Sequence, residues 1–112
     1  MPQTSHRLEK FSSTLQQNLA QILLTELSNP EFKLVTISHV IVSPDLRHAQ
    51  VFVSSLKENM DEVITELESA SGFIKHLLGR RMRLRYIPEL VFHKDRGYEM
   101  EQAIAQMAKP RP

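Results

Sequence analysis

Two stretches rich in β-branched residues lie close together in this sequence, at 33–43 (KLVTISHVIVS) and 49–56 (AQVFVSSL). Both are too irregular to form the apolar stripe of a helix, and both are therefore predicted to be strands. Only the five residues from Pro44 to His48 separate them, and Pro44 and Asp45 favour a turn. Because the connection is so short, we predict an antiparallel hairpin, which commits the fold to a β-sheet.

A long amphipathic helix is predicted before the hairpin, over residues 6–27. Its apolar residues recur at steps of three and four with polar residues between them. Ser5 is a candidate N-cap, and Asn29-Pro30 is expected to end the helix because proline disfavours helical geometry in the residue before it. A helix of this length could cover one face of a small sheet.

Two further helical segments follow the hairpin, one from about Asp61 and one from Phe73. The step Ala70-Ser71-Gly72 separates them, because glycine is a weak point in a helix interior. A third strand is predicted over Pro88–His93, and its connection to the second strand through helices favours parallel pairing. Asp95 is a candidate cap for a last short helix that would contain Met100, Ile104 and Met107.

Length and composition predict one folded domain. The chain has 112 residues, 41% of them hydrophobic, and only three glycines, which is typical of a globular protein that buries one core. It contains no cysteine, so disulfides and thiolate metal sites are excluded. We expect a single cytoplasmic domain over 1–112, with no signal peptide or membrane span, a core at about 6–95 and a short helix and tail at 96–112.

The charge is unevenly distributed along the chain. Residues 73–96 hold seven Lys/Arg and two acids, a balance of +5, and the remaining residues hold seven Lys/Arg and eleven acids, a balance of −4. Together these give the net charge of +1. Residues 73–88 hold five Lys/Arg and a histidine but no acid. Such a concentration of cations attracts a polyanion, which points to nucleic acid.

A helical wheel of 73–83 separates an apolar arc (Phe73, Ile74, Leu77, Leu78) from a basic face. Arg81 would point into the apolar arc, so either its aliphatic stem snorkels outward or, as we favour, the helix distorts soon after Gly79. Gly72 and Gly79 could let a phosphate approach the backbone closely. A merely solvent-facing basic face is the alternative, but it would normally contain interspersed acids. The candidate RNA-binding residues are Arg47, Gly72, Lys75, His76, Gly79, Arg80, Arg81, Arg83, Arg85 and Lys94.

No catalytic constellation is apparent. The five histidines are scattered without metal-ligand spacing, and the sequence has no P-loop, dinucleotide fingerprint or nucleophile elbow. Most of the aromatic residues fall in apolar stripes or strands, so a stacking platform is less consistent with the sequence than binding through charge and shape. An adaptor whose acidic first and second helices bind a basic protein partner is the alternative from another class, and a minimal nuclease ranks last.

Several stretches together resemble the ribosome-binding factor A family of bacterial small-subunit maturation factors. They are 35–54 (VTISHVIVSPDLRHAQVFVS), 70–85 (ASGFIKHLLGRRMRLR) and 88–95 (PELVFHKD), and the end of the first helix, 26–32 (ELSNPEF), matches as well. The resemblance covers most of the chain, from about residue 6 to 95. No single stretch is specific, but the combination is.

The resemblance implies an α+β, type II KH-like fold with the order αββααβ. Its three-stranded sheet would have helices packed on one face, with an Ala-x-Gly kink, here Ala70-Ser71-Gly72, in place of the GxxG loop of RNA-binding KH domains. It also implies a non-enzymatic factor that binds the free or immature 30S subunit, assists late maturation and 5′-end processing of 16S rRNA, and supports growth in the cold. We expect a monomer with no cofactor, metal or small-molecule substrate.

Overall fold

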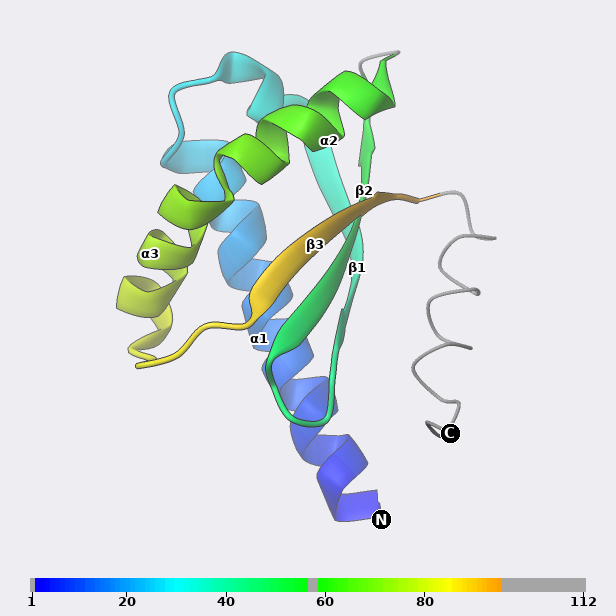
Figure 1. The fold of residues 1–112 in the computed structure, drawn as a ribbon, viewed down its shortest axis with the longest axis vertical. Helices are drawn as coiled ribbons and strands as arrows, with labels where there is room; N and C mark the ends of the chain where they lie inside the picture. The colour runs from blue at the N-terminus through cyan, green and yellow to red at the C-terminus, as the bar shows by residue number, and fades with distance from the viewer. Residues whose placement is uncertain (1, 57–58, 96–112) are drawn as a thin grey trace.

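The fold is seen in a computed structural model that describes residues 2–56 and 59–95, with side chains from Arg7 onward. The predicted α+β class and the αββααβ order are confirmed. The predicted C-terminal helix lies outside the described residues. In chain order the elements are α1 (Pro2–Thr25), the 3-10 helix η1 (Pro30–Leu34), β1 (Val35–Val42), β2 (His48–Ser55), α2 (Met60–Ser69), α3 (Ser71–Met82) and β3 (Glu89–Lys94) (Figure 1).

The sheet has the strand order β1-β2-β3, with β2 in the centre. β1 and β2 pair antiparallel, which confirms the predicted hairpin, and the register is irregular between Ile37 and His39. β3 pairs parallel to β2, with His48 opposite Glu89 and Val53 opposite Lys94. The hairpin turn therefore lies at the end of the sheet where β3 begins.

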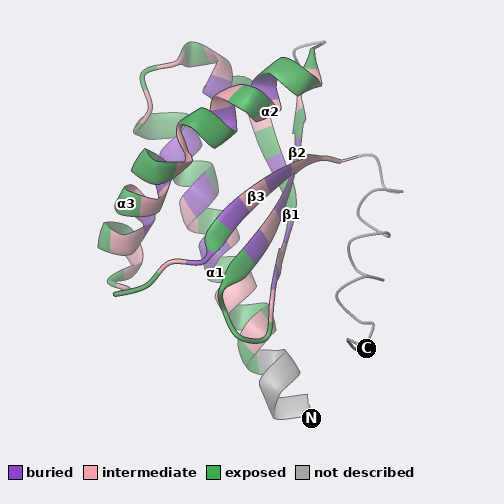
Figure 2. Cartoon of the chain, viewed as in Figure 1, coloured by how far each residue is buried: buried purple, intermediate pink, exposed green. Residues whose placement is uncertain are grey.

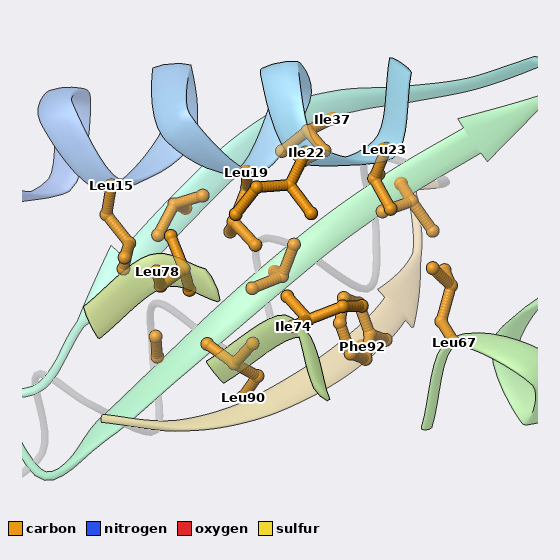
Figure 3. Close-up of a cluster of buried hydrophobic side chains, with 14 of the residues drawn as sticks. Leu15, Leu19, Ile22, Leu23, Ile37, Leu67, Ile74, Leu78, Leu90 and Phe92 are labelled. Atoms are coloured by element: carbon orange, nitrogen blue, oxygen red, sulfur yellow. The ribbon is translucent and has the colours of Figure 1, made fainter. Parts of the chain in front are cut away.

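The core lies between one face of the sheet and the three helices. Alternate strand residues such as Val51 and Val53 are fully buried on that face. Residues at steps of three and four on the helices meet them, and burial is concentrated on the facing sides of the two layers (Figures 2 and 3). The helical side of the core consists of Leu15, Leu19, Ile22, Leu23, Val63, Leu67, Ile74 and Leu78.

Both predicted limits of the first helix are wrong. The helix begins at Pro2, so Ser5 lies within it, and it ends at Thr25, before Asn29. The Thr25 hydroxyl donates to the carbonyl of Gln21 at 2.7 Å, an interaction that competes with regular helix continuation. Asn29 instead caps η1, where its side chain accepts a hydrogen bond from the Glu31 backbone N–H at 2.9 Å.

Candidate nucleic-acid interface

The break between α2 and α3 is a single residue, Ala70. Its backbone N–H donates to the carbonyl of Glu66 at 3.1 Å, and its carbonyl accepts from the N–H of Ile74 at 2.9 Å. Ala70 therefore closes one helix and opens the next, with Ser71 and Gly72 in the first turn of α3. The two helices run in different directions on either side of it (Figure 1). After this change of direction, α3 packs against α1 with Ile74 and Leu78 and leaves its other side exposed.

The buried side of α3 is narrower than the predicted apolar arc. Ile74 and Leu78 are fully buried, whereas Leu77 is half-buried and Phe73 is 53% exposed. The prediction that Phe73 belongs to the core is therefore wrong. Ile74 and Leu78 are one helical turn apart and define the line of contact, and Phe73 lies about 100° or more from it. An aromatic ring is thus left at the surface beside the helix break.

Three of the candidate cations are paired with carboxylates in this structure. Lys75 Nζ lies 2.6 Å from Glu89 Oε2, Arg81 Nη1 lies 2.9 Å from Glu26 Oε2, and Lys94 Nζ lies 2.9 Å from Asp61 Oδ1. The hydrogen bond from Lys75 lowers the pKa of Glu89, so this pair stabilises the fold above the unfolded pKa of Glu89 and the contribution is lost as the pH falls through the lowered value.

Arg81 does not mark a distortion of α3. The helix continues to Met82, so the favoured prediction of a distortion after Gly79 is wrong. The side chain instead extends across to α1, where its Nε donates to Asn18 Oδ1 at 3.3 Å, and its Nη1 is bound by Glu26, the first residue after that helix. The side chain is 32% exposed, so its charged group remains at the surface. Arg81 therefore links α3 to α1.

A second group of candidate cations is exposed and has no carboxylate partner in the described part of the chain. It comprises His76 and Arg80 on α3, Arg83 at the end of α3, and Arg85 in the following loop. Arg83 has left-handed backbone geometry, with φ 56° and ψ 42°. Left-handed geometry costs about 1–2 kcal/mol for a residue with a Cβ. The arginines at 80, 83 and 85 form what we term the open arginine group.

Arg47 lies in the hairpin turn at the same end of the sheet as the loop after α3. Asp45 fixes this turn, because its Oδ1 accepts from the Ser43 hydroxyl at 2.7 Å and from the Arg47 N–H at 3.0 Å. These bonds lower the pKa of Asp45. The Arg47 carbonyl accepts from the N–H of Glu89 at 2.8 Å, which joins the turn to the start of β3. Lys94 lies five residues after Glu89 on β3, about 17 Å from the start of that strand.

The two candidate glycines have different surroundings. A methyl group at Gly79 would lie 3.5 Å from the Leu84 carbonyl oxygen and 3.7 Å from Ile87 Cγ1, so this glycine faces the chain's own loop. A methyl group at Gly72 would meet no heavy atom within 4 Å beyond its own helical turn. Gly72 is exposed. Of the two, only Gly72 leaves the backbone open to a large ligand.

Replacing Gly72 with alanine is expected to separate stability from binding. The site has space and helical geometry, so the free energy of unfolding should rise by about 0.4–1 kcal/mol. If a phosphate approaches this backbone, the added methyl should weaken RNA binding, because the phosphate could no longer come as close. Urea denaturation and a binding titration measure the two effects. A more stable protein with unchanged affinity would remove Gly72 from the RNA-binding surface.

Tyr86 is an exposed aromatic residue that the sequence reasoning did not select. It is 83% exposed and follows Arg85 directly. Among the described residues, neither its ring nor its hydroxyl has a partner. Its position directly after the basic block, in the short connection between a helix and a strand, was the available signal, because such connections usually run over the surface.

An acidic cluster lies away from these arginines, on η1 and α2. Carboxylate oxygens of Glu31, Glu62 and Glu66 lie within 4.8 Å of one another. Carboxylates can hold a divalent cation, but each of these three residues has a further interaction within the molecule. We therefore derive no metal site from the cluster.

Comparison with known proteins gives one consistent family. The family model for Ribosome-binding factor A matches residues 7–108. A ribosome-binding factor A from Aromatoleum aromaticum is 36% identical and covers 97% of this chain and 91% of its own length. One from Natranaerobius thermophilus is 43% identical, with coverage of 92% and 80%.

Solved structures agree with the sequence matches. The crystal structure of ribosome-binding factor A from Thermus thermophilus has a TM-score of 0.72 and 25% identity, covering 78% of this chain and 93% of that one. A homology model of the Thermus factor, fitted into a cryo-electron microscopy map of a 30S complex, has a TM-score of 0.65 and 28% identity, with coverage of 76% and 91%. No helix within the described residues is long and apolar enough to cross a membrane.

Proposed function

The chain belongs to the ribosome-binding factor A family, and from this premise we propose that it binds the free or immature small ribosomal subunit through its rRNA. The open arginine group carries the proposal. Arg80, Arg83 and Arg85 fall within six residues, are exposed, and have no carboxylate partner in the described part of the chain. Guanidinium groups bind phosphate in bidentate geometry, so such a group suits an RNA backbone.

The geometry of Arg83 supports this assignment. Glycine would adopt its left-handed conformation without the cost that a side chain incurs. An arginine at that position is accounted for if its side chain has a use beyond ending the helix. The candidates Gly72, His76 and Arg47 extend the proposed surface along α3 and to the hairpin turn. Lys75, Arg81 and Lys94 would first have to exchange their carboxylate partners for phosphate.

The proposed role is non-catalytic and acts in the cytoplasm, without a cofactor. Binding energy for one conformation of the rRNA would shift the folding equilibrium of the immature particle, and release would follow once the mature arrangement no longer fits. We place this role in late maturation and 5′-end processing of 16S rRNA, with its largest effect in the cold. The Thermus homologue fitted into a 30S complex is consistent with a small-subunit partner.

Co-sedimentation of the purified protein with free small subunits tests the proposal. The protein is expected to sediment with the subunits at low salt and to be released as salt rises, because counterion release drives phosphate binding. Nuclease treatment of a captured complex separates this function from the adaptor alternative, since an adaptor would keep its protein partner after the RNA is destroyed. Retention after nuclease, together with no sedimentation at low salt, would refute the proposal.

A further inference from the structure

The loop from Arg83 to Pro88 is held at both ends. At its start, the N–H of Leu84 donates to the carbonyl of Gly79 at 3.1 Å. At its end, Pro88 is fully buried and the N–H of Glu89 is bound by the hairpin turn. Ile87 is half-buried against the core. The loop backbone is thus fixed before any ligand arrives, which reduces the entropy lost on binding.

Three side chains of this loop point away from the core: Arg83, Arg85 and Tyr86 are exposed. A single exposed aromatic residue is common in proteins and carries no meaning alone. Here, however, the ring is on a fixed loop and directly follows an arginine of the open arginine group. The cations select an anionic partner, and the ring offers a flat apolar face beside them.

We propose that Tyr86 stacks on an unpaired nucleobase of an RNA whose backbone the open arginine group binds. This inference rests on the proposed function and deepens it by naming the form of RNA that is recognised. Consecutive Cα atoms are about 3.8 Å apart, so Arg85 and Tyr86 can reach the phosphate and the base of neighbouring nucleotide positions. A duplex offers phosphates and 2′-hydroxyls but hides the faces of its bases. The site is therefore expected to prefer single-stranded RNA.

The test compares Tyr86→Ala with Tyr86→Phe, which keeps the aromatic face. The probes are a short single-stranded RNA of mixed sequence and the same strand annealed to its complement. Base stacking on an aromatic residue accounts for about ten-fold or more in affinity. Tyr86→Ala should lose this factor for the single strand only, and Tyr86→Phe should retain it. Neither variant should change the thermal melt, because Tyr86 is 83% exposed and has no ring-stacking or hydrogen-bond partner among the described residues.

A fluorescence measurement gives an independent reading. The chain contains no tryptophan, so Tyr86→Trp introduces a single indole whose emission should be quenched by the single strand and not by the duplex. Equal affinity of the wild-type protein for strand and duplex, undetectable binding of both included, would overturn the stacking proposal. So would a loss in Tyr86→Ala that is the same for both probes. Co-sedimentation of the wild-type protein with small subunits tests the proposed function separately, so a failure of the stacking proposal can be distinguished from a failure of subunit binding.

Discussion

Replacing both Arg80 and Arg83 with glutamate is expected to abolish co-sedimentation with free small subunits at moderate salt. The double substitution changes the net charge from +1 to −3, since each replacement changes it by −2, and it places two carboxylates where phosphates would bind. The milder variant with alanine at both positions should reduce the magnitude of the negative slope of log K against log[salt] by about 1.4–1.8, slightly less than one for each lost phosphate contact. The thermal melt should stay close to that of the wild-type protein, because both side chains are exposed and lack an ion pair with any described residue.

A matched control makes this result specific to position. Lys10 and Lys33 are also exposed, and they lie on α1 and η1. Replacing both with glutamate causes the same change in net charge away from the open arginine group. This control should weaken binding only modestly, through the long-range field. If both double variants lose binding equally, the attraction depends on net charge and the surface formed by Arg80 and Arg83 is not the RNA site.

The arrangement of the strands could be predicted from the sequence because it depends on the length and type of the connections between neighbouring elements. The five-residue connection specified the hairpin, and the helical crossover between the second and third strands specified their parallel pairing. The limits of the first helix depended on finer interactions. The Thr25 hydroxyl bonds back to Gln21 and Asn29 caps η1, and the helix ends two residues before the predicted limit at residue 27.

The predicted basic surface was harder to define, since ion pairs join residues that are distant in the sequence. Arg81 and Glu26 are 55 residues apart, and Lys75 and Glu89 are 14 apart. A count of charges between residues 73 and 88 includes both cations but neither of their partners. The packing of α3 against α1 and β3 decides which of these cations meets a carboxylate, and this packing cannot be read from the local sequence. Phe73 shows the same limit, because its exposure depends on how narrow the buried side of α3 is.

Leu78→Ala is expected to lower the free energy of unfolding strongly. Leu78 is fully buried, and it and Ile74 are the two fully buried side chains of α3 among the described residues (Figure 3). Removing a buried leucine side chain costs about 2–5 kcal/mol, through the lost transfer free energy and the cavity left behind. Domains of this size have a total stability of about 5–15 kcal/mol, so the midpoint of urea denaturation, followed by far-ultraviolet circular dichroism, should fall sharply.

Leu24→Ala is the matched control, because it removes the same atoms from a helical leucine that is 50% exposed. Its cost should stay below about 1 kcal/mol, and an equal cost for both variants would contradict the position of Leu78 in the core. At a temperature where Leu78→Ala remains folded, it should still bind small subunits, since its side chain does not reach the surface. The double arginine variant should behave in the opposite way, losing binding while keeping its stability. Together, the Leu78 variant and the double arginine variant would show that the buried face of α3 stabilises the fold and that its exposed face binds the RNA.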